Sequence, residues 1–305
     1  MTKLWGQPFR LQPAFSRLVT RHGPVLPVAL AFSAAAFAAV ESAKPGLDVG
    51  VVITDAAKSK DFYGGVLGLK AAGAIPLPTG GTMIRYQSGA SILKLLAYEK
   101  PPAVTGGPTR AAIGIRLITI YTTDRAGVIE RAAQRGLKLE LQEVRPGVSY
   151  GFLPDPDGNV IEVVTMPPDT PAATMQRVAI GLTVADAAKS RAFYSKVLGL
   201  EEQPPQELAN NGGTKYSFTS GASIVKFWQA AAGTPVKTGG VQEGAGIRYF
   251  TFMVKDVDAA QAWLVERGAK IAMPPTDFGK LARIMFVTDP DGNYIEFAGP
   301  SKPAK

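Results

Sequence analysis

The sequence of 305 residues contains no cysteine, and its single histidine, His22, lies in the N-terminal segment. Without cysteine the chain can form no disulfide, offer no thiolate to a metal and carry no thiol nucleophile. If the N-terminal segment is removed, histidine is lacking as well. Sites that depend on imidazole, such as the iron site of two histidines and one carboxylate, are then excluded.

Clusters of basic residues are also missing from most of the chain. The formal net charge is +8, of which +4 falls in residues 1–38, and the remaining charge is spread without basic runs. A nucleic-acid-binding protein would carry a basic stripe or patch, so no nucleic-acid partner is expected. The segment 1–38 holds no acidic residue, and its cations are Lys3, Arg10, Arg17 and Arg21.

An uncharged stretch, residues 23–40, follows this basic leader. The small-residue pattern Ala36-Phe37-Ala38 fits a signal-peptidase site. It predicts a signal peptide over residues 1–38 and a periplasmic or secreted mature chain. Two alternatives remain open, an uncleaved N-terminal membrane anchor and a mitochondrial presequence. After cleavage of the leader, no stable membrane insertion is expected.

A duplication becomes visible when the chain is compared with itself. Residues Ile53–Lys70 match Val184–Glu201 at an offset of 131, and the turn DPDGN recurs at an offset of 134. Nearly constant offsets indicate two copies of one module with small changes in the loops. The first module spans residues 47–166 and the second spans 177–299. The linker between them, residues 167–176, is rich in proline and threonine.

Each module divides again into two halves with the same order of elements. Four strand–helix–strand–strand–strand units predict an α+β protein with curved sheets and helices outside. The aromatic pairs on the helices are expected to pack helix against sheet; they are Phe62 with Tyr63, and Phe193 with Tyr194. The predicted helix N-caps are Asp55, Asp124, Asp186 and Asp256. The strands predicted in the first module are Leu47–Thr54, Thr82–Gln87, Ser91–Tyr98, Ile115–Thr122, Leu137–Val144 and Val160–Thr165.

Two motifs carry a resemblance to a known family. The pattern FY…VLGL on the first helix of each module and DPDGN.IE on its last strand resemble the vicinal oxygen chelate superfamily. That group includes glyoxalase I, extradiol dioxygenases and the bleomycin- and mitomycin-resistance proteins. The resemblance covers residues 47–299. It implies that each module's sheet curls into a cup, and that a divalent metal is held there from the first, fourth, fifth and eighth strands.

This chain departs from the family at most of those ligand positions. The family usually has His, Glu, His or Gln, and Glu there, and six of the eight positions in the two modules differ. An ammonium in such a position repels a metal ion, so neither a metal nor another cofactor is expected. In strand order, the positions hold Asp48 and Ala179, Lys94 and Lys226, Leu117 and Tyr249, and Glu162 and Glu296.

A lysine and a glutamate in one cup suggest an ion pair in place of the family's metal–carboxylate contact. We predict that Lys94 or Lys226 neutralises Glu162 or Glu296, because an unpaired buried charge is costly. The sequence leaves open whether the pair forms within one module or between the two. The alternative is that these side chains reach solvent at the mouth of the cup.

Aromatic side chains are expected beside these charges. Strand alternation turns Trp228, Tyr249 and Tyr294 of the second module into its cup, where the first module has aliphatic residues. The same alternation turns Arg116 and Arg248 away, toward the surface or an interface. Aromatic walls with few polar groups describe a small-molecule pocket, although the rings can equally fill the cup as core. The predicted ligand-binding residues are Asp48, Lys94, Glu162, Lys226, Trp228, Tyr249, Tyr294 and Glu296.

Three functions are compatible with this pattern. The favoured prediction is an exported protein that binds a small apolar or aromatic ligand without a metal. A second is a metal-independent lyase or isomerase with a lysine as base or Schiff-base former; its catalytic candidates are Lys94, Glu162, Lys226 and Glu296. The third is a non-catalytic interaction module. A dioxygenase is not expected, and a monomer is compatible with two modules in one chain.

Overall fold

The computed structural model describes residues 41–208 and 212–302. The predicted signal peptide, residues 1–38, lies outside the described residues. Within the described part of the chain, no helix is both long and apolar enough to cross a membrane. The first strand begins at Asp48, close to the expected start of the first module.

The first module consists of two successive units. The first unit comprises β1 (Asp48–Ile53), α1 (Ala56–Lys60), the π-helical turn η1 (Asp61–Val66), β2 (Lys70–Pro76), β3 (Thr82–Ser88) and β4 (Ser91–Ala97). The second unit comprises β5 (Gly114–Thr122), α2 (Arg125–Ala133), β6 (Gln142–Arg145), β7 (Val148–Pro154) and β8 (Val160–Thr165).

The second module repeats this order after a short 3-10 helix, η2 (Ala172–Gln176). Its first unit comprises β9 (Val178–Val184), α3 (Ala187–Ala192), the π-helical turn η3 (Phe193–Val197), β10 (Glu201–Leu208), β11 (Gly213–Ser220) and β12 (Ser223–Gln229). Its second unit comprises β13 (Gly246–Met253), α4 (Val257–Glu266), β14 (Lys270–Phe278), β15 (Ala282–Thr288) and β16 (Tyr294–Gly299). The predicted α+β class with four units is confirmed.

The four predicted helix N-caps are confirmed. In each case the aspartate carboxylate accepts hydrogen bonds from backbone N–H groups of the first turn, groups that have no partner within the helix itself. Two strands of the first module, β2 and β7, were not predicted from the sequence. The strand expected at Leu137–Val144 is only the short β6, which starts at Gln142.

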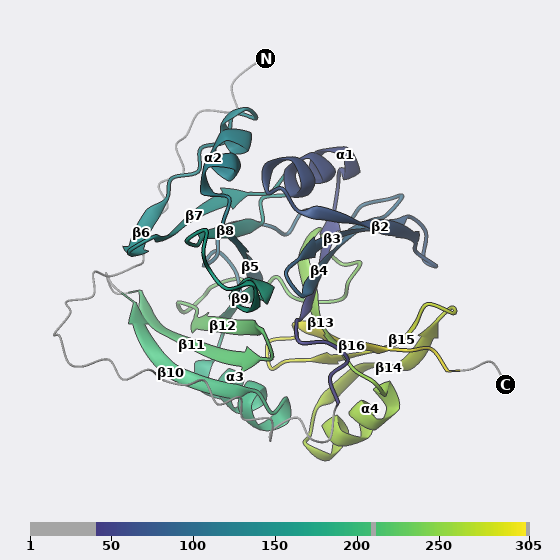
Figure 1. Cartoon of the computed structure of the whole chain (residues 1–305). Helices are drawn as coiled ribbons and strands as arrows, with labels where there is room; N and C mark the ends of the chain where they lie inside the picture. Colours follow the sequence, from purple (N-terminus) through teal and green to yellow (C-terminus); the bar gives the residue numbers. More distant parts are fainter. Residues whose placement is uncertain (1–40, 209–211, 303–305) are drawn as a thin grey trace.

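The strands form two eight-stranded sheets that mix the modules. We name them after a central strand: the β1 sheet has the order β14-β15-β16-β13-β1-β4-β3-β2, and the β5 sheet has the order β10-β11-β12-β9-β5-β8-β7-β6. Each sheet therefore joins one unit of the first module to one unit of the second. The seams are the antiparallel pairs β1–β13 and β5–β9. Figure 1 shows the β1 sheet on the right and the β5 sheet on the left.

The expectation that each module curls into its own cup is wrong. The concave face of the β1 sheet, here called the β1 cup, is built from the first unit of module one and the last unit of module two. The concave face of the β5 sheet, the β5 cup, is built from the two middle units. Each module supplies half of each cup, because its two half-sheets pair with half-sheets of the other module at β1–β13 and β5–β9.

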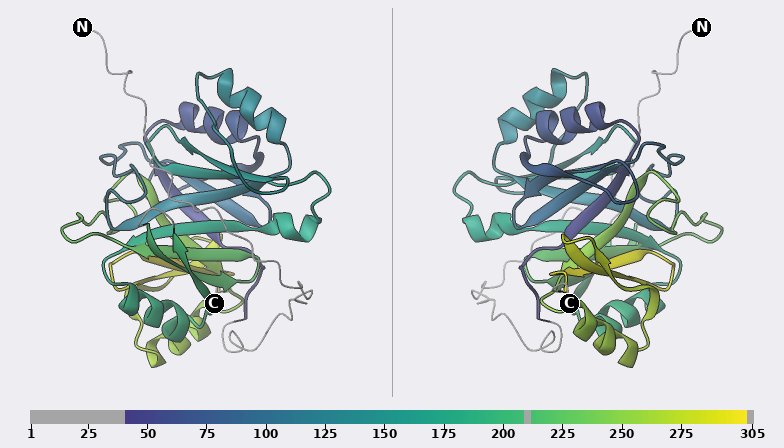
Figure 2. Two further views of the ribbon diagram at one scale, coloured as in Figure 1. Left: turned by 90° about the vertical axis from the view of Figure 1, so that its left-hand side faces the viewer. Right: turned by 90° about the vertical axis from the view of Figure 1, so that its right-hand side faces the viewer.

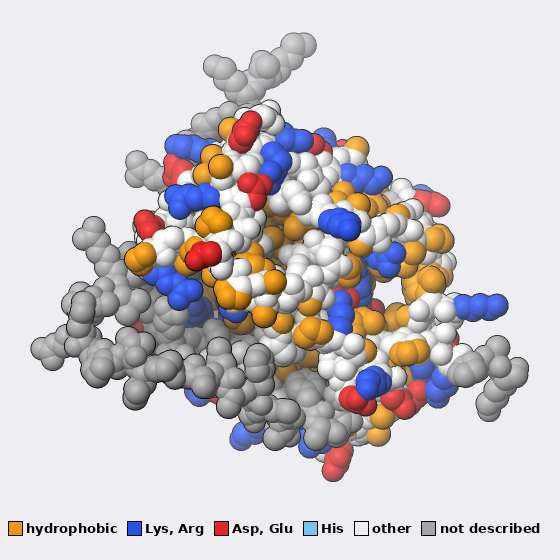
Figure 3. Space-filling model, viewed as in Figure 1, with side chains coloured by type: hydrophobic (Ala, Val, Ile, Leu, Met, Phe, Trp, Pro, Cys, Tyr) orange, Lys and Arg blue, Asp and Glu red, His pale blue; other side chains and the backbone are white. Residues whose placement is uncertain are grey.

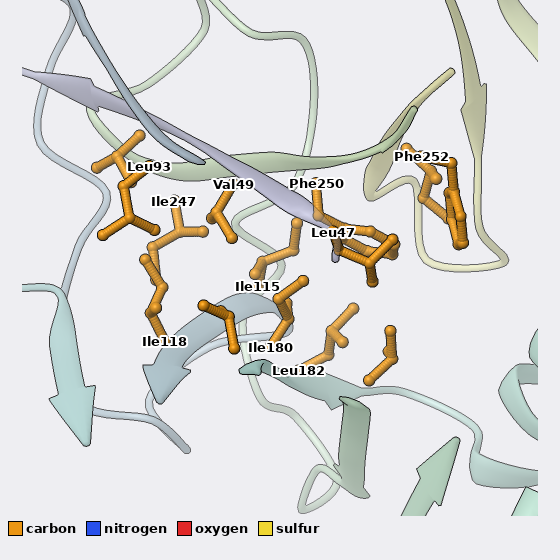
Figure 4. Close-up of a cluster of buried hydrophobic side chains, with 14 of the residues drawn as sticks. Leu47, Val49, Leu93, Ile115, Ile118, Ile180, Leu182, Ile247, Phe250 and Phe252 are labelled. Carbon is orange, nitrogen blue, oxygen red and sulfur yellow. The ribbon is translucent and has the colours of Figure 1, made fainter. Parts of the chain in front are cut away.

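The main core lies between the two sheets. Side chains from the seam strands meet there, among them Val49 and Phe250 of the β1 sheet and Ile118 and Ile180 of the β5 sheet (Figure 4). The helices of module one lie together at one end of the molecule and those of module two at the other (Figure 2). The predicted helix aromatics are buried in this core, in agreement with a packing role.

The DPDGN turns connect the two sheets. Asp155, in the turn before β8, accepts a hydrogen bond of 2.8 Å from the hydroxyl of Tyr63, on the helix of the other sheet. Asp289 accepts a bond of 3.0 Å from Tyr194 in the matching place of module two. Both carboxyl groups are buried. In each module, the aspartate of the recurring motif therefore links two units that belong to different sheets through a buried hydrogen bond with a tyrosine.

Candidate functional site

The two cups contain the same polar group at their centre. In the β1 cup, the ammonium of Lys94 on β4 lies 2.6 Å from a carboxylate oxygen of Glu296 on β16. In the β5 cup, Lys226 on β12 lies 2.6 Å from Glu162 on β8. The predicted lysine–glutamate pairing is present in both cups. Each pair joins the two modules, which settles the question that the sequence left open.

A threonine completes each pair. The hydroxyl of Thr119 donates to Glu162 at 2.5 Å, and the hydroxyl of Thr251 donates to Glu296 at 2.5 Å. In parallel strand pairs the glutamate and the threonine are direct neighbours, so their side chains share the concave face. The lysine and glutamate side chains are 12% and 7% exposed in both pairs, so the charges lie on the cup floor rather than in open solvent.

The environment of Glu162 keeps it ionised. Burial alone would raise the pKa of this carboxyl, but the charge of Lys226 and the hydrogen bonds from Lys226 and Thr119 outweigh burial and hold the pKa below its usual value. Such a pair is weak evidence for stability by itself, because desolvation of both groups cancels most of the attraction. Removing one partner would leave an uncompensated charge, which is strongly destabilising.

The donor set does not fit the divalent metal that the family usually holds. In both cups the lysine ammonium occupies the contact with the glutamate that a cation would need. At the first-strand position, Asp48 is engaged by Lys44 and by the backbone N–H of Ile92, and Ala179 offers no donor. Among the described residues, no group of three or more histidine, cysteine or acidic side chains is placed to hold a metal ion.

The three aromatic residues predicted for one cup are divided between two. Tyr249 on β13 and Tyr294 on β16 lie in the β1 cup, and Trp228 on β12 lies in the β5 cup. The prediction placed them together because they belong to one module. Strand alternation was right for each residue, but the units of one module belong to different sheets.

The β1 cup is filled by its own side chains. The ring of Tyr249 packs directly on Gly50, where a Cβ atom would overlap it, and the ring edge of Tyr249 meets Phe286 at 5.5 Å between centroids. Lys94 sits over the same tyrosine ring, 5.4 Å from its centroid. Apolar side chains from both halves surround this group: Val52, Leu77, Met83, Leu96, Tyr98, Met273, Phe278, Ile284 and Tyr294.

The β5 cup holds a smaller apolar cluster of Leu117, Phe152, Val160 and Trp228. Leu117 stands in the position of Tyr249, and Val160 in that of Tyr294, so two aromatic rings of the β1 cup are replaced by aliphatic groups. Its floor on β9 carries Ala179 and Gly181. At the place of Leu96 the β5 cup has the larger Trp228, so the two cups differ in which side chains lie over the same lysine–glutamate–threonine group.

Two cationic residues of the β5 cup were missed by the sequence interpretation. Lys215 on β11 is the cross-strand partner of Trp228, so both side chains point into the cup. The guanidinium of Arg110 lies 5.5 Å from the centre of the Trp228 ring, and its Nη2 donates to the carbonyl of Gly212 at 2.5 Å. The short turn after Ser220 fixes this register and could have identified Lys215 from the sequence.

Arg116 and Arg248 do not lie on the surface as predicted. They are 6% and 4% exposed, and each sits at a register shift of its strand, which frees it from the strict alternation. Arg116 donates to the carbonyl of Thr105 at 2.7 Å, and Arg248 donates to the carbonyl of Gly240 at 2.9 Å. Both arginines therefore hold the loops that precede β5 and β13, away from the lysine–glutamate pairs.

On the face shown in Figure 3, basic and acidic side chains are interspersed with apolar ones. The candidate charges in the cups are distinguished by their burial and pairing. Of the predicted ligand-binding residues, the structure places Glu162, Lys226 and Trp228 in the β5 cup. It places the others in the β1 cup: Asp48, Lys94, Tyr249, Tyr294 and Glu296.

Two tandem modules, paired curved sheets and a polar group at the family's ligand positions define the class of this protein. The family model described as Glyoxalase/Bleomycin resistance protein/Dioxygenase superfamily matches residues 47–163 and 175–297. The chain belongs to this superfamily, as the resemblance of its motifs implied.

Solved structures show the same fold at low sequence identity. Glyoxalase I from Zea mays is 18% identical with a TM-score of 0.63, over 84% of this chain and 92% of the maize chain. A protein from Bacillus subtilis suggested to be a dioxygenase is also 18% identical, with a TM-score of 0.60, over 85% of this chain and 86% of its own. A comparison with curated proteins found no match. These similarities establish the fold and leave the chemistry to be argued from the cups.

Proposed function

We propose that this protein binds a small, flat, apolar or aromatic molecule in the β5 cup, without a metal ion. The difference between the cups carries the proposal. Both have the same lysine–glutamate–threonine group, but in the β1 cup the rings of Tyr249, Phe286 and Tyr294 pack on one another. The β5 cup has Leu117 and Val160 in place of the two tyrosines and sets Trp228 and Lys215 beside its ion pair. An apolar wall with a few convergent polar groups is the usual composition of a small-molecule site.

Metal independence is supported by the position of Lys226. Its ammonium lies 2.6 Å from Glu162, and a divalent cation at the same carboxylate would be within repulsive range of it. Export of the mature chain is part of the same proposal and rests on the leader in residues 1–38. The N-terminal sequence of the protein recovered from its producing cell tests that part.

Binding is favoured over lyase or isomerase chemistry by the same ion pair. A lysine acts as base or Schiff-base former when its amine is neutral. The Nζ atom of Lys226 lies 2.6 Å from the Glu162 carboxylate. A carbonyl compound would have to displace this contact before it could react with the amine.

Matched substitutions in the two cups test the proposal. We expect Lys226→Met and Lys94→Met to destabilise the protein by a similar amount, roughly 3–5 kcal/mol, because each leaves a buried glutamate unpaired. Only Lys226→Met should weaken the binding of 2-naphthylmethanol, measured by tryptophan fluorescence in the presence of EDTA. Because Lys226→Met alone can fail to fold, the double variant with Glu162→Gln serves as its stable counterpart.

If Lys94→Met weakened the binding of 2-naphthylmethanol as much as Lys226→Met does, the assignment of the site to the β5 cup would be wrong. Absence of saturable binding by neutral one-ring and two-ring aromatic alcohols would contradict the proposal itself. Binding that appears only after addition of a divalent metal would contradict metal independence. Reductive trapping of a carbonyl compound on Lys226 with borohydride would favour the enzymatic alternative.

A further inference from the structure

The β5 cup contains a hydrogen-bond donor and positive charges that have no matching partners in residues 41–208 and 212–302. Lys215 makes no hydrogen bond or ion pair with any described residue, although its side chain faces the cup beside Trp228. The indole Nε1 of Trp228 is buried and has no acceptor within the described part of the chain. Trp228 itself is only 7% exposed. A buried donor without an acceptor is costly, and the described residues supply none to this indole.

The charges of the cup do not balance. Glu162 is in contact with Lys226 at 2.6 Å and is shared at longer range by Lys215, so one carboxylate serves Lys226, Lys215 and Arg110 among these side chains. Burial and the nearby ammonium of Lys226 lower the pKa of Lys215, so the chain already bears a cost for placing this second cation there. Arg110, over the Trp228 ring at 5.5 Å, adds a third positive group at the mouth.

The duplication supplies a comparison within the same molecule. In the β1 cup, the residue at the place of Lys215 is Met83, and the residue at the place of Trp228 is Leu96. Both pack into the apolar filling of that cup. The fold therefore needs neither a cation nor an indole at these positions. Lys215 and Trp228 are features of the β5 cup alone.

We propose that the β5 cup takes an aromatic carboxylate, whose ring lies against Trp228 and whose carboxylate meets the ammonium of Lys215. This inference rests on the proposed function and names its ligand class. A carboxylate supplies acceptors for Lys215 and the Trp228 indole, and its negative charge reduces the excess of cations from two to one. A flat ring suits the aliphatic and aromatic side chains around Trp228.

Two pairs of probes test the ligand class, 2-naphthoate with 2-naphthylmethanol and benzoate with benzyl alcohol. Within each pair the ring is the same and only the carboxylate differs. We expect the carboxylates to bind about tenfold tighter or more, as for a charge-assisted hydrogen bond. Lys215→Met, which installs the residue of the β1 cup, should reduce carboxylate affinity to that of the alcohol and leave alcohol affinity unchanged. Lys196→Met, a substitution of an exposed lysine on η3, is the control.

Equal affinities within both pairs, or equal weakening of acid and alcohol by Lys215→Met, would overturn the carboxylate and leave aromatic binding intact. Absence of binding by all four probes would overturn the proposed function together with this inference. A pH series adds a second readout. As the pH rises toward the lowered pKa of Lys215, the wild-type protein should lose its preference for the acids, while Lys215→Met should show no preference to lose.

Discussion

At the scale of single residues, the aspartate that opens each DPDGN turn is the best-defined titrating group of the fold. Asp289 accepts hydrogen bonds from the backbone N–H groups of Asp291 and Asn293, from the Asn293 amide and from Tyr194, all at 2.9–3.0 Å. Burial nevertheless raises the pKa of Asp289 to about 6. The glutamate seven residues later, which the motif also contains, instead meets a lysine.

This raised pKa predicts how stability depends on pH. The folded state holds the proton of Asp289 more tightly than the unfolded state, so its contribution is fully present below pH 3.8 and is lost as the pH rises to about 6. The loss amounts to about 3 kcal/mol for a shift of this size. In Asp289→Asn this dependence is absent. The free-energy difference between wild type and variant, from urea unfolding between pH 4 and 7, should therefore fall with pH; a constant difference would refute the assignment.

The residues of the candidate site were largely predictable from the sequence, but which of them lie together in one cup was not. The lysine and glutamate positions followed from segments that recur in both modules, SGASILK and SGASIVK for the lysines and DPDGN.IE for the glutamates. Arg116 and Arg248 were misplaced because bulges break the strand alternation. Lys215 was missed because its face follows only from the register that the turn after Ser220 imposes on β11 and β12.

At the scale of elements, the ring of Tyr249 on β13 packs against the backbone of β1 and fills the centre of the β1 cup. Gly50 leaves the space that the Tyr249 ring occupies, and any larger residue would displace that ring. The Tyr249 ring in turn packs against Phe286, which belongs to the same apolar cluster. The corresponding glycine of the other sheet, Gly181, lies under Leu117 and Trp228 instead.

Substitution of this glycine tests the packing. We expect Gly50→Ala to destabilise the protein by about 1–3 kcal/mol, as overpacking does in other cores. In the background of Tyr249→Leu, which matches the β5 cup, the same change should cost much less, because the ring it displaces is gone. Denaturant unfolding of the four proteins of this double-mutant cycle measures the coupling. A purely additive cycle would show that the ring does not fill the space above Gly50.

The helices and inner strands could be predicted because their signals are local. Aspartate caps mark the helix starts, and apolar alternation marks β1, β4, β5 and β8. The strand β2, with the sequence KAAGAIP, has little strand propensity and lies at a sheet edge, where pairing with β3 holds it extended. The strand β7 contains glycine and ends in proline, two residues that are uncommon in strands, so its sequence also gives a weak strand signal.

At the scale of the whole molecule, each module is split between two sheets. The sequence predicts two like modules, but both copies carry the same strand patterns, so nothing local states which half-sheet joins which. The pairing is decided by the long-range seams β1–β13 and β5–β9. This is why the contents of each cup could not be assigned, even though the residues of the cups could.

Cleavage of the linker tests this arrangement. A specific protease site inserted between Asp169 and Thr170 lies in an exposed stretch between β8 and η2. After cleavage, the two modules should remain one particle in size-exclusion chromatography and separate only under denaturing electrophoresis, because each sheet takes strands from both. Two separate peaks under native conditions would show that the modules fold and persist independently.

The duplicated cups also give the chain an internal guide for protein engineering. The β1 cup, packed with its own rings, acts as a second core, so its residues are tied to stability. Under the proposed function, the β5 cup can be reshaped where the other cup shows that the fold accepts a different residue, at Leu117, Val160, Lys215 and Trp228, while the buried Lys226–Glu162 pair is kept. These four positions are the starting points for engineering a new specificity.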